Sequence, residues 1–76
     1  MPHRPRPPGY PAPVWYFRVV ELAPDKWECR HGEKTFDIHQ EMTQAVDHLR
    51  TLAVDKQPAE LFLHLLDGTV RNLGTI

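Results

Sequence analysis

Cys29 and His31 are the residues whose types and spacing most directly suggest covalent chemistry. They stand two positions apart in a segment that alternates apolar and polar residues, which places both side chains on one face of a strand. A thiol beside an imidazole can act as a nucleophile with its general base. A free cysteine is nevertheless more often a small buried hydrophobe, and a single dyad specifies little. We therefore expect Cys29 to be buried and the protein to have no enzymatic activity.

The chain also has five histidines, which raises the question of a metal site. No two of them have the i, i+4 spacing that brings ligands together on a helix. We expect His39 and His48, nine positions apart, to lie on different sides of one helix. Cys29 and His31 supply at most two of the four ligands that a structural zinc ion takes. The sequence therefore predicts no bound metal and no cofactor.

His64 and Arg71 are expected to face each other across a hairpin whose turn is Asp67-Gly68. A type I′ turn needs positive φ at both central residues, which Asp-Gly favours. A solvated polar pair is the simpler interpretation of His64 and Arg71, and a contact to a phosphate or carboxylate is the alternative. The turn itself accounts for Asp67.

The elements that position these residues follow from periodicity. β-branched and aromatic runs or strict alternation indicate strands, and apolar residues at helical spacing indicate one helix. The expected strands cover 14–22, 26–31, 34–38, 60–66 and 69–73, and the helix covers 38–54. Asp37 and Gln40 fit a capping box at its start, and Pro58 limits its end. The order β-β-β-α-β-β predicts an α+β fold, with an antiparallel sheet of four to five strands and one helix on one face.

A chain of 76 residues forms at most one small domain, and its composition is that of a globular protein. Residues 1–13 hold six of the eight prolines and two of the nine basic residues, so we expect a Pro-rich basic flexible arm. It is either a free tail or a contact to an acidic partner. Residues 14–76 form the domain and carry seven basic and ten acidic side chains, a net charge of −3.

Cellular location is suggested by two features of the chain. One cysteine permits no internal disulfide, which suits a reducing cytosol. No apolar run approaches the roughly 20 residues that span a bilayer, and the N-terminus lacks a signal-peptide pattern. We expect a cytoplasmic protein without membrane contact.

A group of residues beyond the arm resembles a small bacterial family, domain of unknown function 2188. The resemblance covers about residues 14–75 and is carried by Trp27, Phe36, Ala45-Val46, Ala53, the run from Glu60 to His64, Asp67-Gly68 and Val70. Where the family has a Thr-Lys pair, this chain has Ile38-His39, so no role of that pair carries over. The resemblance implies this fold and a bacterial or phage origin, and it implies no activity.

The main functional expectation concerns which side chains lie on each of the two faces of the sheet. Pairing about Pro24-Asp25 sets Leu22 opposite Trp27 and Val20 opposite Cys29, and these side chains would lie under the helix with Tyr16, Leu61 and Leu63. The opposite face would then carry a candidate binding set: Trp15, Phe17, Val19, Arg30, Phe62, His64, Leu66, Arg71 and Leu73. A contiguous apolar patch of this kind usually marks an interaction site.

We therefore expect a non-enzymatic interaction module that binds a second copy of itself, as a homodimer, or docks on a larger protein. The alternative is a single-stranded RNA or DNA binder that uses the same aromatic and Arg residues. The patch could also be covered by the arm folding over it. A register slip of one residue, which would exchange the two faces, stays open as well.

Overall fold

The computed structural model describes residues 14–76, and the predicted arm lies outside them. The elements are β1 (Trp15–Ala23), β2 (Lys26–His31), β3 (Lys34–His39), α1 (Met42–Ala53), the 3₁₀ helix η1 (Val54–Lys56), β4 (Ala59–His64) and β5 (Val70–Thr75). Their order and the single α-helix within the described residues confirm the predicted α+β fold.

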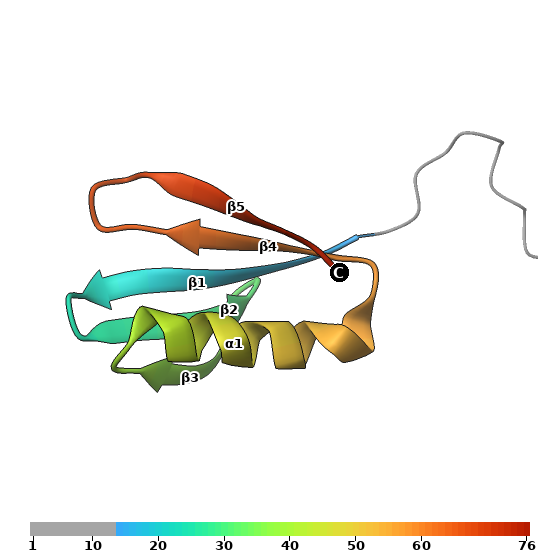
Figure 1. Cartoon of the computed structure of the whole chain (residues 1–76), viewed down its shortest axis with the longest axis horizontal. Helices are drawn as coiled ribbons and strands as arrows, with labels where there is room; N and C mark the ends of the chain where they lie inside the picture. The colour runs from blue at the N-terminus through green and yellow to red at the C-terminus, as the bar shows by residue number, and fades with distance from the viewer. Residues whose placement is uncertain (1–13) are drawn as a thin grey trace, which may run out of the picture.

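The five strands form one sheet in the order β3-β2-β1-β4-β5 (Figure 1). Three neighbouring pairs are antiparallel, but β1 and β4 are parallel. The expectation of a purely antiparallel sheet is therefore wrong. The connection from β3 through α1 carries the chain across the sheet, and β4 then runs beside β1 in the same direction.

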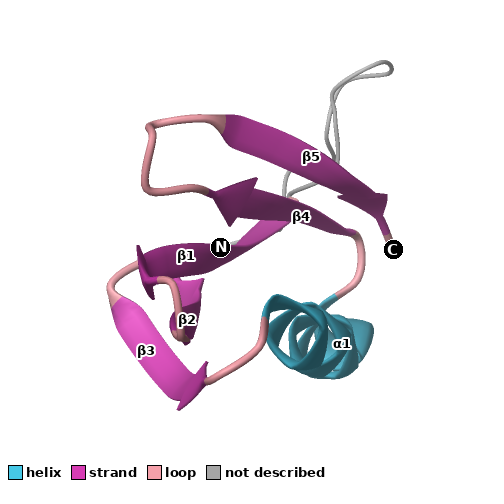
Figure 2. Ribbon diagram, turned by 60° about the vertical axis from the view of Figure 1, so that its left-hand side comes forward, coloured by secondary structure: helices cyan, strands magenta, loops and turns pink. Residues whose placement is uncertain are grey.

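Helix α1 crosses one face of the sheet, and Figure 2 shows it nearly end on with the strands curving past it. It buries Ala45, Leu49 and Ala53 at helical spacing. The predicted start at 38 with a capping box is wrong, because β3 continues to His39 and the N-cap is Glu41, whose side chain makes no capping bond.

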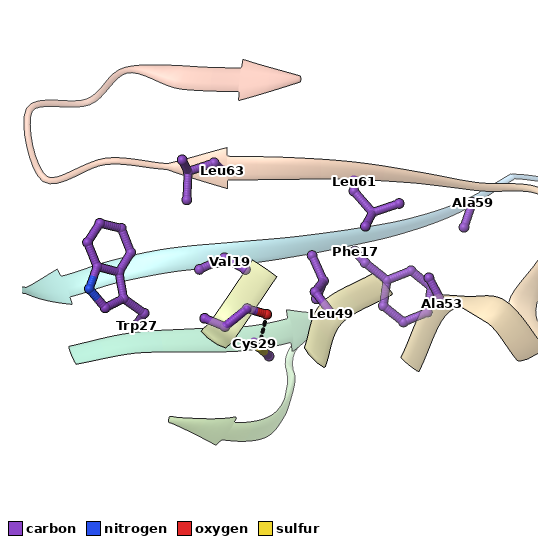
Figure 3. Packing of buried hydrophobic residues seen from close by; sticks show 10 residues of the cluster. Phe17, Val19, Trp27, Cys29, Leu49, Ala53, Ala59, Leu61 and Leu63 are labelled. Carbon is purple, nitrogen blue, oxygen red and sulfur yellow. Dashed lines mark hydrogen bonds between the residues drawn. The ribbon is translucent and has the colours of Figure 1, made fainter. Parts of the chain in front are cut away.

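The core lies between α1 and the sheet (Figure 3). Its ten buried side chains come from three strands and the helix: Phe17, Val19, Trp27, Cys29, Ala45, Leu49, Ala53, Ala59, Leu61 and Leu63. Burying a large apolar side chain contributes about 1.5–3 kcal/mol relative to leaving it exposed. This cluster is therefore the main favourable contribution that offsets the chain entropy lost on folding.

The face of β1 that contacts the helix is the opposite of the one expected. Phe17 and Val19 are buried, at 2% and 0% exposure, and β1 pairs Val19 with Cys29. The cause is a bulge at Leu22, because Glu21 lies opposite Trp27 and Ala23 lies opposite Lys26. One extra residue on β1 exchanges the two faces for the rest of that strand.

The β4–β5 connection also differs from the prediction. Val70, and not Arg71, pairs with His64, and residues 65–69 form the loop. Among the described residues positive φ occurs at glycines alone, so Asp67 does not have the conformation of a type I′ turn. Leu66 consequently lies in the loop, 56% exposed, and not on the sheet face where the pattern placed it.

Strand β5 places two more candidate residues differently. Arg71 pairs with Leu63, which puts it on the helix side and not beside His64. Leu73 packs against the buried core, because another bulge interrupts the pairing of β5 with β4 between Leu61 and Phe62. Neither residue belongs to the helix-free face.

Residues 14–76 contain no helix with the length and apolar character needed to cross a bilayer.

Candidate functional site

The face of the sheet away from α1 has no element over it within residues 14–76 (Figure 2). Strand partners share a face, so the observed register identifies its central residues. We call this surface the open face, and we define it by Tyr16, Arg18, Val20, Glu28, Arg30, Glu60, Phe62 and His64.

Two aromatic rings lie near the centre of the open face on the parallel strands β1 and β4. The ring centroids of Tyr16 and Phe62 are 6.2 Å apart, and Tyr16 is 57% exposed. Arg18 lies beside Phe62 in the register and donates a hydrogen bond of 3.0 Å to the Gly32 carbonyl. These side chains and His64 line a shallow depression of about 160 Å³. The open face thus offers aromatic surface next to a positioned guanidinium.

The charges of the open face are mixed. Arg18 pairs across the sheet with Arg30, whose Nε lies 3.2 Å from Glu28 Oε1. Glu60 lies beside Tyr16 on the neighbouring strand. The open face therefore carries two positive and two negative side chains, not a basic surface.

Of the nine residues predicted for this surface, Arg30, Phe62 and His64 lie on the open face. Trp15 does not, because it pairs with Ala59 on the helix side. There its ring centroid lies 4.9 Å from that of His31, and Lys56 Nζ lies over the ring at 5.0 Å. The exchanged faces of β1 bring Tyr16, Arg18 and Val20 to the surface instead. The alternation of residue types alone could not predict which face of β1 contacts the helix, because apolar residues occur at both the odd and the even positions of this strand.

A second group of side chains that could bind a ligand lies on the helix side, at the end of β3. Cys29, Asp37, His39 and His48 each offer one ligand atom, and these atoms lie within 4.8 Å of one another. We call them the histidine cluster. His39 Nε2 is 3.2 Å from His48 Nδ1 and 3.1 Å from Asp37 Oδ1, while His48 Nδ1 is 2.5 Å from Asp37 Oδ2.

The expectation that His39 and His48 lie on different sides of one helix is wrong. His39 ends β3 and is not in the helix, and Asp37 and His39 pair with Cys29 and Trp27 on the helix side of the sheet. Helix α1 passes over this position and contributes His48. The alternation Asp37-x-His39 could have placed both side chains on one face of a strand. The predicted helix began at residue 38 and therefore separated these two residues.

Cys29 is fully buried, as expected, and its thiol donates a hydrogen bond of 3.3 Å to the Ala45 carbonyl (Figure 3). Burial, and then the negative charge of Asp37, raises the pKa of this thiol to about 12. His31 packs against the rings of Trp15 and Phe17 instead, with its ring 5.0 Å from that of Phe17. The polar neighbours of Cys29 are thus the Ala45 carbonyl and the other three residues of the histidine cluster.

Comparisons of the chain with models of protein families, with curated proteins and with solved structures find no match. The resemblance to domain of unknown function 2188 therefore stays a prediction.

Proposed function

We propose that the protein is a non-enzymatic interaction module that associates with a second copy of itself through the open face. The observation that carries this proposal is a sheet face without a covering element among the described residues, with Tyr16 and Phe62 at its centre. Aromatic and Arg side chains are enriched where binding energy concentrates in protein interfaces.

The charge pattern favours a second copy over a partner of different chemistry. A two-fold interface uses the same patch on both protomers, so the patch must be complementary to itself. The open face meets this requirement, because Arg18 and Arg30 lie near Glu28 and Glu60. Across a two-fold axis the arginines of one protomer can approach the carboxylates of its partner while the aromatic residues pack at the centre.

Binding of single-stranded nucleic acid is the second candidate, and the Tyr16–Phe62 pair beside Arg18 is the observation that favours it. Exposed aromatic rings on a sheet can stack unpaired bases. The balanced charge of the open face and the net charge of −3 for residues 14–76 weigh against it, because phosphate affinity comes largely from cationic side chains.

The test compares the solution mass of the wild type with that of Phe62→Glu by light scattering. We expect the wild type at twice the 8.8 kDa chain mass and Phe62→Glu as a folded monomer, because two buried carboxylates would oppose each other across the axis. Val54→Glu is the matched control, since Val54 is an exposed apolar residue of η1, away from the open face.

A monomeric wild type would contradict the proposed association of two copies through the open face. Binding to a labelled oligonucleotide that weakens steeply between two salt concentrations and is lost in Phe62→Glu would establish the nucleic-acid candidate instead. Absence of both would leave the open face without either proposed partner and would contradict the proposal.

The remaining assignments are part of the same proposal. A cytoplasmic location is supported by a lone cysteine that lies buried in the core. A bacterial or phage origin rests on the resemblance to domain of unknown function 2188.

A further inference from the structure

The histidine cluster has the spacing of a tetrahedral metal site. Zinc–nitrogen bonds of about 2.0–2.1 Å give a tetrahedron whose edges are about 3.3 Å. The ring nitrogens of His39 and His48 are 3.2 Å apart, and His39 Nε2 is 3.1 Å from Asp37 Oδ1. The imidazole and carboxylate atoms are therefore already at the separations that one shared ion requires, and the Cys29 sulfur lies within 4.8 Å of them.

An unsatisfied acceptor supports the same interpretation. Asp37 Oδ1 is buried and accepts no hydrogen bond, although His39 Nε2 lies 3.1 Å away. Buried polar atoms without partners are uncommon, and a bound ion is one of the ways in which such atoms are satisfied. A cation among these atoms would neutralise the carboxylate and occupy a lone pair on each ring nitrogen.

The chemistry of the four donors indicates which ion. A thiolate selects soft or borderline metals, imidazole suits zinc and several more transition metals, and a carboxylate also ligates zinc. Calcium and magnesium prefer oxygen ligands alone. We propose that Cys29, Asp37, His39 and His48 form a structural zinc site.

The site would join three elements. Cys29 belongs to β2, Asp37 and His39 belong to the edge strand β3, and His48 belongs to α1. On binding, the Cys29 sulfur exchanges its hydrogen bond to Ala45 for a bond to zinc, and the thiol proton passes to solvent. Four protein ligands complete the coordination shell, so the ion holds β3 against α1 and has no open position for a reaction.

The ion has a route into the site from solvent. The side chain of His48 is 38% exposed and that of Asp37 is 32% exposed, whereas Cys29 lies at the bottom of the cluster. This inference does not depend on the open face, which is on the opposite side of the sheet.

The experiment measures zinc affinity of the full chain, after treatment with a chelator, by competition with a chromophoric zinc indicator. We expect one zinc ion per chain, and we expect Co²⁺ to give the visible spectrum of a tetrahedral site with a thiolate-to-cobalt charge-transfer band. His48→Gln should weaken zinc binding at least about a hundredfold, because loss of an outer-shell partner alone costs about 10–100-fold. His31→Gln is the matched control, and its affinity should equal that of the wild type.

Equal zinc affinity in the wild type, His48→Gln and His31→Gln, or no binding at all, would overturn the site and leave an Asp–His hydrogen-bonded group. A cobalt complex without the charge-transfer band would exclude Cys29 as a ligand and contradict the four-ligand site.

Zinc should also raise the unfolding temperature of the wild type and of His31→Gln but not that of His48→Gln. Because His48 is partly exposed, His48→Gln tests the site without a substitution in the buried core.

Discussion

The two faces of the sheet are built from the same strands, but they carry different kinds of side chain. On the helix side, Phe17 and Leu61 are almost completely buried beneath α1. On the open face, their direct neighbours Tyr16 and Phe62 remain accessible, together with arginines and glutamates. One strand thus supplies the core with every second residue and a potential interface with the residues between.

The difference between the faces depends on one residue. Leu22 bulges from β1, so the residues before it are shifted by one position relative to β2. Without the bulge, Tyr16 and Arg18 would point toward the helix and Phe17 would point away. Packing α1 over an arginine without a partner would be costly, and for this reason the bulged register is the stable one.

The largest expected effect in a test of this comparison comes from Phe17→Ala. Removing a buried aromatic side chain costs about 3–5 kcal/mol, which is enough to unfold much of a domain this small. Tyr16→Ala, one residue away on the open face, should cost below about 1.5 kcal/mol, the upper range for one aromatic pair. Urea unfolding, at protein concentrations where the chain is monomeric, measures both values. Equal losses would mean that the two faces of β1 are assigned incorrectly.

A smaller effect is expected at the bulge of β5. Gly74 has a φ of +108°, a conformation that residues with a side chain rarely adopt, although a Cβ there would contact nothing within 4 Å. Gly74→Ala should therefore destabilise the fold by about 1–3 kcal/mol through backbone strain. It should also loosen Leu73, which this bulge allows to reach the core.

Thermal unfolding of Gly74→Ala beside Thr75→Ala, an exposed neighbour, is the measurement. Backbone strain at Gly74 is excluded if the two variants unfold at the same temperature.

The smallest effect is expected at the loop between β4 and β5. Hydrogen bonds from Thr69 lower the pKa of the exposed Asp67 carboxyl, and the Thr69 amide donates to it at 2.8 Å. A carboxyl whose pKa is lower in the folded state stabilises that state above its unfolded pKa, and this stabilisation is lost as the pH falls through the folded value. Asp67→Asn keeps an acceptor but cannot titrate, so its urea midpoint should fall less between neutral pH and strongly acidic pH. An identical fall in both proteins would contradict this role of Asp67.

Much of the fold could be predicted from local pattern. The alternation of β2 and β4 correctly placed Cys29 and Leu61 toward the helix and Phe62 away from it. In these two strands the turns and the apolar residues together determine which alternate side chains point toward the core. Strand β1 has apolar residues on both faces, so the prediction of its buried face depended on the residue pairing assumed for the turn to β2. A bulge next to a turn shifts which residues of the two strands pair, and the alternation of residue types in β1 does not indicate it.

The histidine cluster could not be predicted for a different reason. Its residues come from β2, β3 and α1, and their proximity results from how these elements pack. The parallel pairing of β1 with β4 is likewise a contact between distant segments, which hairpin signals do not predict. Spacing along the chain identified the five histidines but gave no information on which of them meet.

The position of β1 has a consequence for the order in which the domain can assemble. This strand comes first among the described elements, yet it lies in the middle of the sheet, between β2 and β4. Until the ribosome has synthesised β4, β1 can pair on one side alone, and Phe17 lacks its partner Leu61. The nascent protein therefore carries an unpaired strand edge until β4 emerges, and a chaperone that shields this edge would reduce aggregation during synthesis.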